Sequence, residues 1–283
     1  MKSTFASLAK CLVASAALLA TASAFAQSLP SDADLEKAAG PLTIASAKVA
    51  TPNGYASGTV YYPTTGTNMG LIVIAPGFTE GPGVNAFWGE KLASWGFVAV
   101  NIGTKTVLDT PPARATQMWA ALQQVVALSH AAGSPFKDKI DASRLAAMGH
   151  SMGGGGTLLI SQDHPELKAA IPMAPWNLPQ KNFPKITVPT MIFACQSDII
   201  APVSGHADRF WASFNTNLPR VFAEVKGQNH FCPTNLAGAA EKAALGRIAI
   251  AWYKVWLDGN TDYQQVYATN TNPIFSRYLT GGF

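Results

Sequence analysis

Charged residues are scarce in this chain of 283 residues. Asp, Glu, Lys and Arg make up 13% of it, against about 25% in an average soluble protein. Hydrophobic residues reach 48%, which excludes an intrinsically disordered chain. The net charge is +4, without any block of basic residues or basic stripe with interleaved aromatics. The composition therefore argues against a nucleic-acid partner.

Long hydrophobic runs are also missing. The apolar stretch over residues 11–20 is too short to cross a hydrocarbon core of about 30 Å at about 1.5 Å per residue. It follows a start that contains Lys2 and Lys10, and small residues after it end in Ala24-Phe25-Ala26. This order is typical of a secretory signal peptide. We therefore predict a leader over residues 1–26, no membrane span, and an exported protein, with the periplasm and the exterior both left open.

Cysteine is rare, with three in the chain. Cys11 lies in the predicted leader, so the mature protein keeps only Cys195 and Cys232. Disulfides persist in exported proteins, and no third cysteine competes, so we expect a Cys195–Cys232 bridge. No cluster of residues with metal-ligand spacing is visible. We expect no metal and no cofactor.

Strand-like and helix-like segments alternate along the chain from residue 42. Short, continuous apolar runs such as 71–75 and 97–102 are typical of strands buried on both faces. The first two strands are predicted to form a hairpin around Asn53-Gly54. The alternation predicts an α/β fold with a mostly parallel sheet covered on both faces, in one domain over 27–283. The predicted strands are 42–49, 59–62, 71–75, 97–102, 145–148, 168–174, 190–194 and 220–225, and the clearest helices are 85–95, one that begins after Pro111-Pro112 and breaks near residues 133–135, and 239–257.

The motif Gly149-His150-Ser151-Met152-Gly153 follows a predicted strand and precedes a glycine-rich helix start. A G-x-S-x-G pattern in this setting forms a sharp strand-to-helix turn that exposes the serine hydroxyl. Ser151 would then lie at a helix N-terminus, where the Met152 N–H and the helix dipole favour a developing oxyanion. The motif predicts Ser151 as a nucleophile.

A serine nucleophile needs a base, and in the α/β-hydrolase order an acid and then a histidine follow the serine. His230 comes after the predicted strand 220–225 and a short loop, so we predict it as the base. The other histidines have structural interpretations. His130 is interpreted as a surface or helix residue, and His164 as a helix C-terminal cap. His206 is interpreted as an exposed helix residue. His150 is adjacent to the serine, but its side chain is expected to point away from the hydroxyl.

The acid that orients His230 should lie on a loop after a strand, between the serine and the histidine. Asp198 follows strand 190–194 by a short loop and meets this condition. The loop Pro76-Gly77-Phe78-Thr79 follows strand 71–75, so the Phe78 N–H is the predicted second oxyanion donor and its ring a wall of the acyl pocket. The other carboxylates between serine and histidine have ordinary solvated or paired interpretations, among them Asp163, Asp208 and Glu224.

With these motifs the chain resembles the bacterial cutinase-type polyester hydrolases of the α/β-hydrolase superfamily, which include the poly(ethylene terephthalate) (PET) hydrolases. The resemblance covers about residues 54 to 262, with the motifs in the same order. It implies Ser151, Asp198 and His230 as the triad and the Phe78 and Met152 N–H groups as the oxyanion hole. It also implies Trp176 and Ile200 as walls of the acyl site. The matching segments are Pro76-Gly77-Phe78, Gly149 to Gly155, Ala174-Pro175-Trp176, Asp198 to Pro202 and His230-Phe231.

Two features indicate the subtype. His150 and Phe231 resemble the cutinase-like substrate cleft, whereas the mesophilic PET hydrolase prototype has Trp and Ser at the matching positions. Cys195 and Cys232 match the extra active-site disulfide of the PET hydrolases. The C-terminal disulfide of the family is absent, because no cysteine follows Cys232. The tail after about residue 263 matches least.

Little more than a dozen residues separate Trp176 from the strand that starts at Thr190, which leaves no room for a lid domain. A groove without a lid admits a polymer chain from the side. The sequence thus predicts a secreted, monomeric serine ester hydrolase that cleaves polyesters of the PET or cutin type. The alternatives are an esterase or lipase for small esters and a non-catalytic binding protein on a hydrolase scaffold. A dienelactone-hydrolase-like enzyme is disfavoured, because that family has Cys in place of Ser151.

Overall fold

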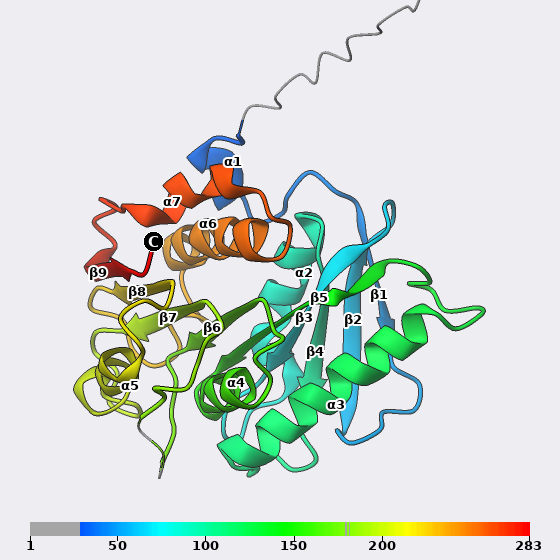
Figure 1. Ribbon diagram of the computed structural model, residues 1–283, viewed down its shortest axis with the longest axis horizontal. Helices are drawn as coiled ribbons and strands as arrows, with labels where there is room; N and C mark the ends of the chain where they lie inside the picture. Colours follow the sequence, from blue (N-terminus) through cyan, green and yellow to red (C-terminus); the bar gives the residue numbers. More distant parts are fainter. Residues whose placement is uncertain (1–28, 179, 181) are drawn as a thin grey trace, which may run out of the picture.

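A computed structural model describes residues 29–178, 180 and 182–283, so the predicted leader lies outside the described residues. Nine strands form one sheet in the order β1-β2-β4-β3-β5-β6-β7-β8-β9 (Figure 1). The strands from β4 to β8 in this order run parallel, while β1, β2 and β9 each pair antiparallel. Their bounds are β1 Ile44–Lys48, β2 Ser57–Pro63, β3 Met69–Ala75, β4 Val98–Gly103, β5 Ile140–His150, β6 Ala169–Met173, β7 Thr190–Cys195, β8 Arg220–Val225 and β9 Phe275–Gly281.

Helices cover both faces of the sheet. One hydrophobic core contains residues of α3, α4 and α5, and a second core on the opposite face contains residues of α1, α2, α6 and α7 (Figure 1). This is the layered arrangement that a mostly parallel sheet requires. The helices are α1 Asp32–Glu36, α2 Ala86–Ser94, α3 Pro111–Ser129, α4 Met152–Asp163, α5 Ala207–Ser213, α6 Ala239–Trp256 and α7 Gln264–Ala268, with short 3-10 turns at Pro82–Asn85, Val203–Gly205 and Thr261–Tyr263.

The central strands are buried along their whole length, which explains their apolar sequences. All residues of β3, β4 and β7 are buried. The polar exception in β4, Asn101, donates from Nδ2 to the Asn85 carbonyl at 2.9 Å. Because β3, β5, β7 and β8 are parallel, their carboxyl ends meet at one edge of the sheet. The loops that contain the predicted site residues all begin there.

The structure confirms the mostly parallel sheet and the antiparallel β1–β2 hairpin, with element bounds that differ by a few residues from the sequence prediction. The largest difference is in β5, which begins at Ile140 instead of residue 145. The polar residues Asp141, Ser143 and Arg144 obscured this start, and Asp141 accepts from the other two. Helices α1 and α7 and strand β9 were not predicted.

Strand β9 joins the edge of the sheet through polar contacts. Arg277 donates to Glu224 Oε2 of β8 at 2.8 Å and to Asp208 Oδ1 of α5 at 2.5 Å. Ser276 Oγ also donates to Glu224, at 2.7 Å. An edge strand held in this way lacks the apolar run that reveals the central strands, so its sequence resembles a loop.

Two absences hold for the part of the chain that the structure describes. None of its helices is long and apolar enough to cross a membrane. No helix occurs among the described residues between β6 and β7, where many hydrolases insert a lid.

Replacement of Arg277 by Ala should lower the free energy of unfolding by about 1–2 kcal/mol, because it leaves the nearly buried Glu224 carboxylate without its cation. Urea unfolding followed by circular dichroism measures this change. Lys137→Ala is the matched control, since it breaks an exposed pair with Asp138 and should shift stability by less than about 0.5 kcal/mol. Equal effects of the two variants would contradict the role given to Arg277.

Candidate active site

Ser151 occupies a strained turn between β5 and α4. Its backbone has φ 54° and ψ −117°, a conformation that L-residues rarely adopt. Steric clashes exclude any larger residue at the two flanking glycines. A Cβ on Gly149 would lie 2.4 Å from the Gly153 carbonyl oxygen, and one on Gly153 would lie 2.5 Å from the Ala75 carbonyl oxygen. The predicted G-x-S-x-G turn therefore forms because only glycine fits where strand, helix and the end of β3 meet.

The loop after β3 lies directly against the serine. A Cβ on Gly77 would approach Ser151 Cβ to 2.8 Å. Thr79 N–H donates to the Val107 carbonyl at 2.8 Å and so anchors the loop beyond Phe78. The Phe78 and Met152 N–H groups make none of the turn, loop or cap hydrogen bonds between backbone groups of the described residues. The two segments that contain these N–H groups meet at Ser151, and the oxyanion hole stays a prediction.

The predicted acid and base are paired. His230 Nδ1 lies 2.6 Å from Asp198 Oδ2, and both side chains are buried. The other carboxylate oxygen, Oδ1, accepts from the N–H groups of Ile200 at 2.8 Å and Ala201 at 2.7 Å. The turn after β7 thus fixes the carboxylate from one side while the imidazole holds it from the other.

These contacts keep Asp198 ionised. Burial raises the pKa of this carboxyl, but the hydrogen bond and charge of His230, together with the two N–H groups, outweigh burial and hold the pKa below its usual value. An ionised carboxylate only accepts, so His230 donates from Nδ1 and its Nε2 faces away from Asp198. None of the described residues hydrogen-bonds to Nε2, Ser151 included. Such catalytic contacts often tighten only when substrate binds.

Four of the predicted substrate-binding residues reach the surface around this pair. Phe78 and Ile200 are 46% and 51% exposed, and Trp176 and Phe231 are half-buried. The fifth, His150, is fully buried, and its ring lies 5.8 Å from that of Phe231 between centroids. Its side chain therefore lies beneath the cleft surface.

The remaining histidines follow their structural interpretations with one exception. His130 and His164 are the C-cap residues of α3 and α4. The prediction that His206 is exposed is wrong: it is 6% exposed and its ring stacks 6.1 Å from that of Trp176. The 3-10 turn before α5 folds this residue under the cleft wall, which helical periodicity alone did not reveal.

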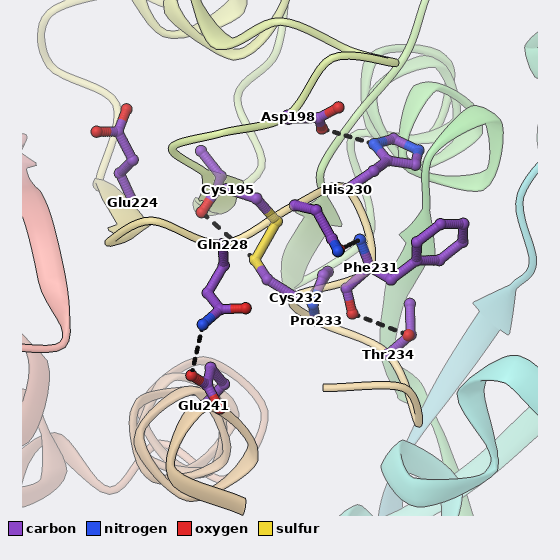
Figure 2. Close-up of a disulfide and its surroundings, with 12 residues drawn as sticks. Cys195, Asp198, Glu224, Gln228, His230, Phe231, Cys232, Pro233, Thr234 and Glu241 are labelled. Carbon is purple, nitrogen blue, oxygen red and sulfur yellow. Dashed lines mark hydrogen bonds and ion pairs between the residues drawn. A yellow bond between two sulfur atoms is a disulfide. The ribbon is translucent and has the colours of Figure 1, made fainter. Parts of the chain in front are cut away.

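The predicted disulfide between Cys195 and Cys232 is present and buried. Figure 2 shows it beside the Asp198–His230 pair, where it joins the segment that leads to the acid with the segment that follows the base. Cys195 ends β7 and Cys232 lies two residues after His230. The bridge therefore limits the separation of the acid and base loops.

Two residues near the site were missed by the sequence prediction. Glu80 contacts His150, and Arg114 of α3 is fully buried beneath the loop after β3. Arg114 donates from Nη1 to the Pro76 carbonyl and from Nη2 to the Val107 carbonyl, each at 2.9 Å. A buried guanidinium that binds loop carbonyls has no sequence signal, because its partners are backbone atoms.

The sheet, the strained serine turn and the Asp198–His230 pair define an α/β-hydrolase. The sequence matches the family model described as "PETase: PET hydrolase-like" over residues 20–279, so the chain belongs to the PET hydrolase-like family and is a carboxylic-ester hydrolase. It is 41% identical to cutinase 1 of Thermobifida cellulosilytica over 83% of this chain and 87% of the relative. It is 41% identical to a cutinase of Thermobifida fusca strain YX (83% and 76%). It is 38% identical to a bis(hydroxyethyl) terephthalate hydrolase of Streptomyces coelicolor (83% and 74%).

Asp198→Asn should lower kcat by about 10³- to 10⁴-fold without unfolding the protein. The amide oxygen still accepts from Ile200 and Ala201, but its NH₂ group faces Nδ1 and forces the imidazole into the wrong tautomer. Steady-state hydrolysis of p-nitrophenyl butyrate, with circular dichroism as a check of folding, measures the effect. A folded variant with less than tenfold loss would exclude Asp198 as the orienting acid.

Removal of the disulfide in a Cys195→Ala/Cys232→Ala variant should lower the free energy of unfolding by about 2–4 kcal/mol. The bridge closes a loop with a sequence separation of 37 residues, and the constraint on the unfolded chain grows with loop length. Denaturant unfolding of the oxidised wild type and the variant gives the difference, and the reduced wild type is the control. Unchanged stability would show that packing alone holds the two loops.

Proposed function

We propose that this hydrolase cleaves polyesters at the sheet edge where Ser151, Asp198 and His230 converge. One observation supports a polymeric, apolar substrate above all. Seven large hydrophobic side chains that are exposed lie on loops after the carboxyl ends of β3, β4, β6, β7 and β8, on the same edge as Ser151. A concentration of exposed apolar residues marks a binding surface. The residues are Phe78, Val107, Leu108, Leu178, Ile199, Ile200 and Leu236.

The openness of this edge supports the same substrate class. The described residues between β6 and β7 form no helix over the site, so a chain that is longer than the cleft is not blocked. Ile199 is 89% exposed and adjoins Ile200, which makes the acid loop an apolar rim. The relatives named cutinase and bis(hydroxyethyl) terephthalate hydrolase act, by their names, on cutin and on bis(hydroxyethyl) terephthalate.

The proposed mechanism is acyl transfer in two steps. His230 Nε2 takes the proton of Ser151 as the hydroxyl oxygen attacks the ester carbonyl, while Asp198 stabilises the imidazolium. The Phe78 and Met152 N–H groups bind the resulting oxyanion, and the alcohol leaves with the proton from Nε2. A water molecule, deprotonated by His230, then hydrolyses the acyl-enzyme and frees the acid.

The cellular setting is also part of the proposal. The leader over residues 1–26 and the export of one catalytic domain, 27–283, follow from the sequence pattern. A buried disulfide beside the catalytic pair is the kind of feature that an oxidising compartment preserves. The monomeric state and the absence of a nucleic-acid partner stay predictions.

Mature protein on amorphous PET film should release soluble aromatic acids, and Ser151→Ala should reduce this release by several orders of magnitude. Chromatography of the supernatant measures the acids, and p-nitrophenyl butyrate provides a parallel soluble substrate. Hydrolysis of the soluble ester without film products would assign the enzyme to small esters. Undiminished activity of Ser151→Ala on both would reject Ser151 as nucleophile.

A further inference from the structure

Glu80 and His150 form a buried polar pair that the mechanism above does not use. His150 is fully buried, and its Nδ1 lies 2.9 Å from Glu80 Oε1 and 3.0 Å from Oε2. Its Nε2 lies 2.9 Å from the backbone carbonyl of His230. Glu80 Oε2 also accepts from the Gly77 N–H at 2.5 Å. Three catalytic segments therefore meet at this pair: the loop after β3, the serine turn and the base loop.

The protonation of the pair follows from its partners. A carbonyl only accepts, so His150 Nε2 bears a hydrogen and donates it to His230. Burial raises the pKa of Glu80, but the hydrogen bond and charge of His150, the Gly77 N–H and the charge of His230 outweigh burial and lower that pKa. The ionised Glu80 carboxylate is in hydrogen-bond contact with His150 Nδ1, and its Oε2 also accepts from the Gly77 N–H. Each polar atom of the pair has a partner.

The connections end on backbone atoms that flank the reacting groups. Gly77 directly precedes Phe78, whose N–H is the proposed oxyanion donor. The His230 carbonyl belongs to the base itself, and the two imidazole rings lie 4.7 Å apart between centroids. A second side chain holds the same loop, because Arg114 donates from Nη1 to the Pro76 carbonyl at 2.9 Å. The loop after β3 thus has two side-chain anchors, and the Glu80 anchor extends through His150 to the base.

We propose that Glu80 and His150 are positioning residues, which set the distance between the oxyanion-hole loop and the catalytic base. This proposal rests on the proposed function, because it assigns the pair to the same Ser151 reaction. Neither residue touches the reacting atoms. Their effect is on kcat, since a fixed oxyanion donor and a fixed base act on the transition state more than on the bound ester.

The central test compares Glu80→Leu with Glu80→Gln on p-nitrophenyl butyrate. The leucine removes both hydrogen bonds, and because displacements of about 1 Å at reacting groups cost about 100-fold, we expect kcat to fall by about 10- to 100-fold with KM within about twofold. Glutamine regains most of this loss, because its oxygen accepts from Gly77 while its NH₂ donates to Nδ1 of a neutral His150. Glu166→Leu is the matched control: Glu166 pairs with His164 at 3.2 Å on the surface, away from the site.

Two further readouts separate positioning from folding. The rate at which a p-nitrophenyl alkylphosphonate phosphonylates Ser151, releasing p-nitrophenolate, should fall in parallel with kcat, since its P=O group occupies the same oxyanion hole. In a double-mutant cycle, Glu80→Leu combined with His150→Phe should lose no more than the worse single variant. If Glu80→Leu does not fold, Glu80→Asp replaces it: its shorter side chain should lower kcat several-fold.

The outcomes are distinct. A folded Glu80→Leu variant with wild-type kcat and phosphonylation rate would overturn the positioning role, and so would equal losses in Glu80→Leu and Glu80→Gln or a Glu80→Asp variant with wild-type kcat. Fully additive losses in the cycle would show that the residues do not act as a pair. If the Ser151→Ala variant, with Glu80 and His150 unchanged, keeps its activity, the proposed function itself is wrong.

Discussion

The close approach of three backbone segments at Ser151 is the constraint on which the rest of the site depends. The turn between β5 and α4 holds Ser151 at φ 54°, and it fits only because Gly153 leaves room for the carbonyl oxygens of Ala75 and Pro76. This contact places the loop after β3 against Ser151, the proposed nucleophile. The parallel order of β3, β5, β7 and β8 then brings the acid and base loops to the same edge.

The loops at this edge are held by cross-links rather than by regular structure. The disulfide joins the acid and base loops, Arg114 binds the carbonyls of Pro76 and Val107, and the Asp198–His230 pair links the loops after β7 and β8. Each link joins loops that follow different strands, so the site is pre-organised. The apolar side chains around it remain exposed. Pre-organised donors and acceptors stabilise a transition state without reorganisation during the reaction.

The parts of this structure that the sequence predicted are those with a local signal. Continuous apolar runs marked the buried strands, and the glycines around Ser151 marked a turn that no other residue fits. Strand β9 was missed because it lacks an apolar run. The Arg277–Glu224 ion pair holds it to the sheet instead. The burial of His150 and His206 and the link from Glu80 to His230 were missed because they depend on which loops become neighbours. That information is absent from spacing within a single segment.

The proposed two-step reaction requires a covalent acyl intermediate on Ser151. Rapid mixing with an activated ester of monomethyl terephthalate, acid quenching within milliseconds and peptide mapping by mass spectrometry would test it most directly. We expect one transient acyl group, located on the peptide that contains Ser151, which appears and decays at rates consistent with turnover. Turnover without any acylated peptide, or an acyl group on another residue that decays at the turnover rate, would contradict it.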